Sequence, residues 1–145
     1  MGRADVELVS TVQKSFEGDL KGVLDDEERI AQVTGLINPE AEIRFMDPQR
    51  SSTGDRLFPE RGVEGLREGW RDWLEPWEAF WIEFGDLHDA GDGRVLSLGV
   101  LRGRLAGGAE LTQPGAALIA VREGKVDSAR FYADQDQARR DAGVD

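Results

Sequence analysis

WRDWLEPWEAFWIEF, residues 70–84, contains all four tryptophans of the chain and two of its six phenylalanines. So many aromatic side chains in a polar, acidic chain predict the centre of the hydrophobic core. Apolar residues recur at helical spacing up to Trp77, and then alternate at Phe80, Ile82 and Phe84. Pro76 lies at the change of period, and proline lacks the backbone N–H that a helix interior needs. A helix is therefore expected to end, and a strand to begin, close to Pro76.

Composition restricts the classes of protein that fit this chain. Its 145 residues, 39% of them hydrophobic, predict one domain over residues 1–145. We expect a cytoplasmic protein without a membrane segment, because no apolar run of about 18 residues and no signal-peptide pattern is present. With no cysteine and one histidine, disulfides are excluded and no metal site is expected. A net charge of -11 argues against nucleic acid as a partner.

The segment before the aromatic stretch predicts two helices and a strand. Apolar residues at spacings of three and four predict a helix over residues 5–20. The acidic run 25–28 suits the first turn of a second helix, whose apolar stripe includes Ile37 and which Asn38-Pro39 is expected to end. Alternation at Ala41, Ile43 and Phe45 predicts a short, half-buried strand.

Residues 49–61 form a polar loop, for which a mobile lid and an ordinary connection both remain open. The third helix is predicted over residues 62–75. Strands and tight turns should follow from residue 79 onward, with strands at 94–105, 110–122 and 125–133. Gly99 and Gly103 predict bulges or sharp bending, and Pro114 predicts a sheet edge or a bulge. A last helix over residues 134–142 should end at Gly143.

This order of elements predicts an α+β fold, in which helices pack on one strongly bent, mostly antiparallel sheet. Such a sheet, wrapped around the N-terminal helices, forms a cone with an internal cavity. The sequence contains no glycine-rich phosphate loop in the required strand, loop and helix context, so no nucleotide cofactor and no other cofactor is expected.

Two long runs of the sequence resemble a known family: HDAGDGRVLSLGVLRGRLAGG at 88–108 and REGKVDSARFYADQDQARRDAG at 122–143. Together with Gln113-Pro114 and the tryptophan-rich third helix, they resemble the SnoaL-like branch of the nuclear transport factor 2-like superfamily. The resemblance implies a cone-shaped α+β barrel, often dimeric through its sheet. The superfamily includes polyketide cyclases, ketosteroid isomerases, limonene epoxide hydrolases and members without known activity, so the resemblance does not choose an activity.

The enzymes of this superfamily resemble one another in placing a carboxylate and hydrogen-bond donors in a hydrophobic cavity. Tyr132 and Asp134 are the catalytic candidates, because they lie two residues apart at the end of the last strand. Asp134 is the nearest match to the acid/base aspartate of the SnoaL-type cyclases, and it equally suits the N-cap of the last helix. Tyr132 suits either an oxyanion donor or a core-edge tyrosine with a satisfied hydroxyl.

The ligand pocket is expected to be lined mainly by aromatic residues. Arg104 belongs to it if the strand face with Arg102 and Arg104 looks inward, whereas an outward face would make both arginines surface residues. His88 suits a surface position or a catalytic one, and Gln113 is placed at the cavity by position alone. The predicted pocket residues are Trp70, Trp73, Trp77, Phe80, Phe84, His88, Arg104, Gln113 and Phe131.

Two functions remain open from the sequence. The first is a cofactor-independent cyclase or isomerase that moves a proton α to a carbonyl of a flat, apolar small molecule. The second is a non-catalytic binding or accessory module whose cavity holds an apolar molecule or is filled by its own side chains. In both cases a homodimer through the sheet is expected, with Trp81 on the exposed or dimer-forming face.

Overall fold

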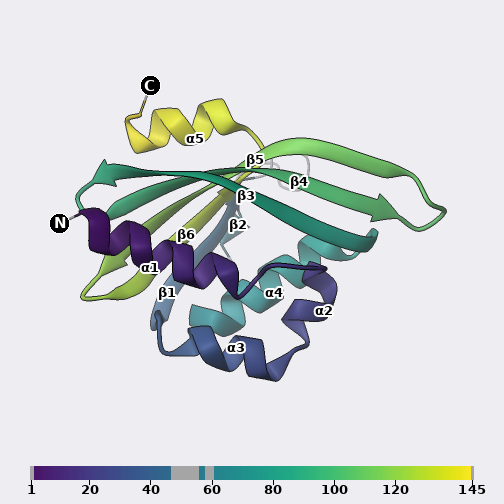
Figure 1. The fold of residues 1–145 in the computed structure, drawn as a ribbon, viewed down its shortest axis with the longest axis horizontal. Helices are drawn as coiled ribbons and strands as arrows, with labels where there is room; N and C mark the ends of the chain where they lie inside the picture. Colours follow the sequence, from purple (N-terminus) through teal and green to yellow (C-terminus); the bar gives the residue numbers. More distant parts are fainter. Residues whose placement is uncertain (1, 47–55, 58–60, 145) are drawn as a thin grey trace.

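A computed structural model describes residues 2–46, 56–57 and 61–144 (Figure 1). The predicted α+β class is confirmed, with helices and one strongly curved sheet. The helices are α1 (Gly2–Lys14), α2 (Leu20–Leu24), α3 (Glu27–Thr34), α4 (Gly62–Leu74) and α5 (Gln135–Ala142). The strands are β1 (Ile37–Met46), β2 (Arg56–Leu57), β3 (Trp77–Gly91), β4 (Arg94–Leu105), β5 (Glu110–Arg122) and β6 (Lys125–Tyr132).

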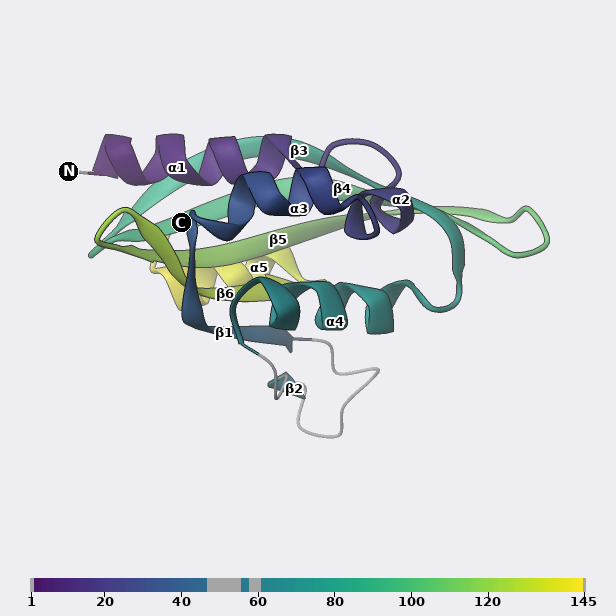
Figure 2. The ribbon, with the colours of Figure 1, turned by 90° about the horizontal axis from the view of Figure 1, so that it is seen from below.

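Within the described residues the strands form one sheet in the order β2-β1-β6-β5-β4-β3. Strands β3 to β6 are joined by hairpins and pair in antiparallel fashion, whereas β1 runs parallel to β6. The mostly antiparallel, bent sheet is therefore as predicted. The sheet curves without closing on itself, so the predicted barrel is an open half-cone (Figures 1 and 2).

Helices cover both faces of the sheet. The helices α1 to α4 lie on its concave side and α5 lies on the opposite side (Figures 1 and 2). The larger hydrophobic cluster contains residues of α1 to α4 and the inward side chains of the strands. A smaller cluster joins α5 to Leu96, Leu118 and Tyr132 on the outer face. A cavity lies within the larger cluster, between the helices of the concave side and the sheet.

The aromatic corner forms where the sequence predicts it. Helix α4 ends at Leu74 with Glu75 as its C-cap, and β3 begins at Trp77. Proline at position 76 cannot continue the helical hydrogen-bond ladder, which accounts for the sharp change. The chain turns there from the base of the concave side into the long outer strand (Figure 2).

The N-terminal segment differs from the predicted single helix over residues 5–20. Helix α1 ends at Lys14, and a separate short helix, α2, begins at Leu20. Between them Gly18 has a φ of 102°, which a continuous helix does not allow. Asp19 then caps α2 by accepting a hydrogen bond from the Lys21 N–H, and the same carboxylate oxygen accepts from the Phe80 N–H of β3.

The second helix and first strand also differ at their boundary. Ile37, predicted on the stripe of the helix, begins β1, and the strand continues through Asn38-Pro39. The helix was expected to end at Asn38-Pro39, but these residues already belong to β1. A strand tolerates proline there because the pairing with β6 is irregular between Ile37 and Glu42. Asn38 also fixes the segment, because its side-chain amide donates to Asp127 and its carbonyl oxygen accepts from the Glu40 N–H.

The predictions from residue 62 onward are confirmed with small shifts at the ends. Pro114 pairs with Val100 of β4, but the pairing of β5 with β6 begins only at Ala116. The proline therefore lies at a local edge, where its missing N–H breaks no ladder bond. Asp134 caps α5 and Gly143 ends it in the left-handed conformation. The choice between lid and connection for 49–61 falls, except for β2 and Arg61, outside the described residues.

Gly99 and Gly103 of β4 have different structural roles. Opposite Gly99 the pairing of β3 and β4 shifts between Phe84 and Leu87, so the predicted irregularity lies in the neighbouring strand. At Gly103 the pairing with β5 is regular, and the missing side chain leaves room for aromatic rings instead of bending the strand. A Cβ added at position 103 would overlap the indole of Trp77 and approach the ring of Phe80 to 2.9 Å.

We therefore expect Gly103→Ala to lower the free energy of unfolding by about 1 to 3 kcal/mol, because Trp77 must move to admit the methyl group. Gly22→Ala is the matched control, since position 22 has open space around it and lies in α2. It should raise stability by about 0.4 to 1 kcal/mol. Urea denaturation measures both values, and equal effects of the two substitutions would contradict the packing argument.

Candidate functional site

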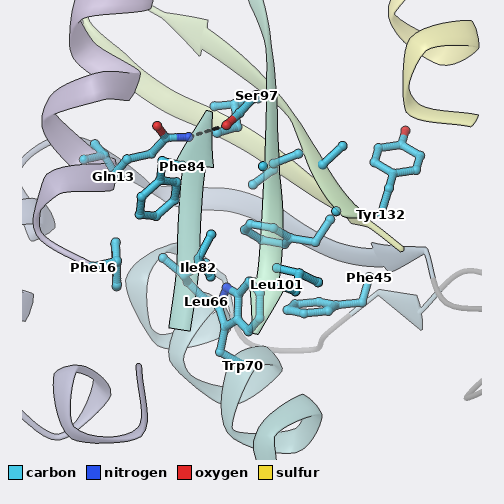
Figure 3. A pocket seen from close by; sticks show the side chains of 18 of the residues that line it. Gln13, Phe16, Phe45, Leu66, Trp70, Ile82, Phe84, Ser97, Leu101 and Tyr132 are labelled. Carbon is cyan, nitrogen blue, oxygen red and sulfur yellow. Dashed lines mark hydrogen bonds between the residues drawn. The ribbon is translucent and has the colours of Figure 1, made fainter. Parts of the chain in front are cut away.

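A cavity of about 110 Å³ lies between the concave face of the sheet and helices α1 and α4 (Figure 3). Its described wall comes from strands β1, β3, β4, β5 and β6 and from helices α1, α2 and α4 with the residues next to them. The lining residues are Val12, Gln13, Phe16, Leu20, Ile37, Ile43, Phe45, Leu66, Trp70, Trp73, Ile82, Phe84, Ser97, Gly99, Leu101, Gly115, Ala116, Ala117, Ile119, Val126, Ala129, Phe131, Tyr132 and Ala133.

One end of the cavity is aromatic. Phe45 of β1 lies opposite Phe131 of β6 in the parallel ladder, and their ring centroids are 4.9 Å apart. Trp70 of α4 meets both rings edge-on, at 5.2 Å from Phe45 and 5.1 Å from Phe131. Edge-on and tilted pairs at these distances are favourable. The three rings form a rigid wall joining α4 to the two parallel strands.

The other end of the cavity is polar. Ser97 of β4 is only 5% exposed, and its hydroxyl oxygen accepts a hydrogen bond from the side-chain amide of Gln13 on α1 (Figure 3). Figure 3 shows this pair at the end of the cavity opposite Trp70 and Phe45. The cavity therefore has an apolar, ring-lined end and an end with one amide and one hydroxyl.

Ionisable groups are nearly absent from the described wall. Of the lining residues that the structure describes, only Tyr132 can titrate, and none is Asp, Glu, His, Lys or Arg. No cluster of three or more potential metal ligands occurs among the residues that the structure describes. A charged molecule in this cavity would have no described opposite charge to pair with, which is costly in an apolar site. The wall suits a neutral molecule.

Tyr132 touches the cavity but directs its hydroxyl elsewhere. It is 3% exposed, and its O–H donates to the Asp141 carboxylate of α5 at 2.7 Å. Figure 3 shows its ring pointing toward α5, away from the centre of the cavity. Burial and then the hydrogen bond to Asp141 raise the pKa of Tyr132 to about 12. This is the geometry of a core-edge tyrosine with a satisfied hydroxyl.

Asp134 has the geometry of a helix cap. Its carboxylate accepts from the Asp136 N–H at 2.9 Å and from the Gln137 N–H at 3.3 Å. The residue is exposed and is not part of the described cavity wall. Because β6 ends at Tyr132, the alternation that was expected to place both residues on one face does not extend to Asp134. The structure does not bring the two catalytic candidates together.

Four of the nine predicted pocket residues line the cavity: Trp70, Trp73, Phe84 and Phe131. Trp77 and Phe80 lie outside it, where their rings pack against each other at 5.3 Å beside Gly103. His88 lies farther along β3, past the register shift, and is half-buried outside the described wall. These three residues contribute to the fold and not to the cavity surface.

The orientation of the hairpin between β4 and β5 places Arg104 and Gln113, both expected in the pocket, outside the described cavity wall. Arg102 and Arg104 look outward, where they form ion pairs with Glu83 at 2.7 Å and with Glu78 at 3.8 Å. The inward face of β4 carries Ser97, Gly99 and Leu101 instead. Gln113 lies on the part of β5 that extends beyond β6, and is exposed.

Gln13 and Ser97 were not assigned to the cavity from the sequence, although the position of Gln13 in the first helix indicates an inward side chain. Residue 13 lies four positions after Val9 and three before Phe16, so it shares the apolar face of the first helix. Ser97 carried no such signal, because both faces of its strand contain apolar residues. Phe45 was predicted to be inward but was not assigned to the pocket.

The sequence matches no family model, and no curated protein is significantly similar to it. Solved structures are similar over nearly the whole chain. An NTF2-like protein from Burkholderia thailandensis E264 is 20% identical, with a TM-score of 0.64 over 97% of this chain and 98% of that chain. TerC, co-crystallised with polyporic acid, is 13% identical, with a TM-score of 0.67 over 97% and 99%.

A protein from Jannaschia sp. CCS1 assigned as a SnoaL-like polyketide cyclase is 15% identical, with a TM-score of 0.66 over 93% of this chain and 88% of that chain. These similarities confirm the predicted fold: the chain has the nuclear transport factor 2-like fold. They extend to proteins of unknown function as well, so they do not assign an activity. None of the described helices has the length and apolar character needed to cross a membrane.

Because the pKa of Tyr132 is higher in the folded chain than in the unfolded chain, the free energy of unfolding depends on pH. The unfolded chain loses the phenol proton near pH 10, whereas the folded chain keeps it to about pH 12. The stabilisation is therefore complete below pH 10 and is lost as the pH rises toward 12. Tyr132→Phe should show a smaller fall in the free energy of unfolding over this range.

Ultraviolet absorbance of the phenolate measures the same pKa directly, because Tyr132 is the only tyrosine in the chain. We expect the native protein to titrate well above pH 10 and the urea-unfolded protein to titrate near pH 10. A native titration near pH 10 would show that the hydroxyl is not held by Asp141 in solution.

Proposed function

We propose that the protein binds a small, neutral, mainly apolar molecule in this cavity and does not catalyse a reaction on it. The observation that carries the proposal is the described wall, which combines three packed aromatic rings with a single amide and hydroxyl pair and no charged side chain. Apolar walls with a few placed polar groups are typical of small-molecule sites.

The volume supports a ligand of about one ring. A dry apolar cavity of about 150 Å³ holds benzene in another protein, and typical sites for larger ligands run from about 300 to 1,000 Å³. At about 110 Å³ this cavity belongs with the first group. Among the flat, apolar small molecules expected from the sequence, we therefore propose a monocyclic ligand.

The preference for binding over catalysis rests on the placement of the two candidates. Proton transfer α to a carbonyl needs a base within hydrogen-bond reach of the substrate. Asp134 is occupied as the cap of α5, and the Tyr132 hydroxyl is occupied by Asp141. The described wall contains no other ionisable side chain, which supports the non-catalytic alternative.

Assembly remains a prediction. We propose a homodimer through the outer face of β3 and β4, where half-buried Trp81 lies opposite Arg102 in the ladder. An indole on an outward sheet face suits an interface core. Light scattering after size-exclusion chromatography measures the mass of the particle. We expect a dimer for the wild-type protein and a monomer for Trp81→Lys.

Toluene tests binding in the cavity. We expect a Kd of about 1 mM or tighter, which corresponds to about -4 kcal/mol and lies within the limits for a ligand of this size. Ala117→Leu should weaken binding at least about tenfold, because it fills the cavity from β5. Ala120→Leu on the same strand is the matched control, since Ala120 is not part of the wall, and should leave binding within about twofold.

The change in tryptophan fluorescence on titration with toluene provides the readout, since Trp70 and Trp73 line the cavity. Absence of saturable binding would overturn the proposal. So would catalysis: if the protein accelerates exchange of the α-protons of cyclohexanone in D₂O, and Asp134→Asn removes the acceleration, Asp134 acts as a base after all.

A further inference from the structure

Ser97 is an unusual residue for the interior of this molecule. Among the described residues, Arg67 and Ser97 are the buried polar or charged residues. Arg67 has a structural explanation, because it joins Glu27 of α3 at 2.7 Å and Glu64 of α4 at 3.2 Å. Ser97 lies on the cavity wall instead, on the inward face of β4.

The hydroxyl of Ser97 has unused hydrogen-bonding capacity. A serine hydroxyl has one proton to donate and two lone pairs to accept with. Gln13 uses one lone pair by donating its amide N–H to the hydroxyl oxygen. Among the hydrogen bonds of the described residues, none has the Ser97 hydroxyl as its donor. A buried donor without an acceptor costs stability, and a molecule in the cavity can supply the missing acceptor.

The opposite end of the cavity restricts where that acceptor can be. Phe45, Trp70 and Phe131 present rings there, and the residues between the two ends are aliphatic, aromatic or glycine. In the described wall the Ser97 end offers a ligand oxygen a hydroxyl donor. The other polar side-chain groups of that wall are the indole N–H groups of Trp70 and Trp73 and the Tyr132 hydroxyl, which donates to Asp141.

We infer that the Ser97 hydroxyl, held in place by Gln13, is the polar anchor of the cavity, and that the ligand is a neutral one-ring molecule with a single hydrogen-bond-accepting oxygen, such as a cyclic ketone. This inference rests on the proposed function, because it requires that the cavity takes up a ligand. It adds the class of ligand and the residue that selects it. The oxygen faces Ser97, and the hydrocarbon ring faces the aromatic end.

Cyclohexanone and methylenecyclohexane test the inference, because they differ only in an oxygen or a CH₂ group at the same position. In Ser97→Ala the affinity for cyclohexanone should fall about fivefold to tenfold, the effect of one lost hydrogen bond. Methylenecyclohexane should bind the variant as it binds the wild type, or slightly more tightly. Ser128→Ala on β6 is the control, since Ser128 does not line the cavity, and should change neither affinity.

The outcomes separate the two proposals. If neither compound binds the wild-type protein, the proposed function fails. If both bind and Ser97→Ala weakens both equally, the anchor is wrong while binding in the cavity stands. A selective loss for the ketone supports the anchor.

Infrared spectroscopy on the wild-type protein keeps the test independent of how the variant folds. The carbonyl stretch of bound cyclohexanone should lie at a lower frequency than that of the ketone in cyclohexane, because a hydrogen bond weakens the C=O bond. A bound carbonyl stretch equal to that in cyclohexane would overturn the inference.

Discussion

The contact among Phe45, Trp70 and Phe131 is the interaction on which the rest of the structure depends. It forms only because β1 and β6 pair in parallel with Phe45 opposite Phe131, and because α4 lays Trp70 across both rings. The contact therefore fixes the position of α4, and with it the starting point of β3 at Trp77. The aromatic end of the cavity is the inner surface of this same contact.

The cavity remains empty of side chains for a related reason. The three rings are rigid and are held against one another, so they do not turn inward to fill the space. The described wall also contains small residues on the sheet side, which are Gly99, Gly115, Ala116, Ala117, Ala129 and Ala133. Large rings at one end and small residues along the sheet together leave space for the cavity.

Local patterns in the sequence predicted the elements that depend on local physics. The corner at Pro76, the hairpins from residue 77 onward and the cap at Asp134 follow from proline, from glycine turns and from the capping preference of aspartate. The parallel pairing of β1 with β6 could not be predicted in this way, because its partners are more than 80 residues apart. The orientation of β4 was also undetermined, since apolar residues on both faces left Arg104 and Ser97 equally eligible to point inward.

The most direct test of this account is the crystal structure of the protein under xenon pressure, because xenon enters apolar cavities and reports whether they are empty. We expect a xenon atom between the rings of Phe45, Trp70 and Phe131 and the small residues of β5, with the three rings in place. A cavity without xenon, or one filled by the ring of Trp70 or Phe131, would contradict it.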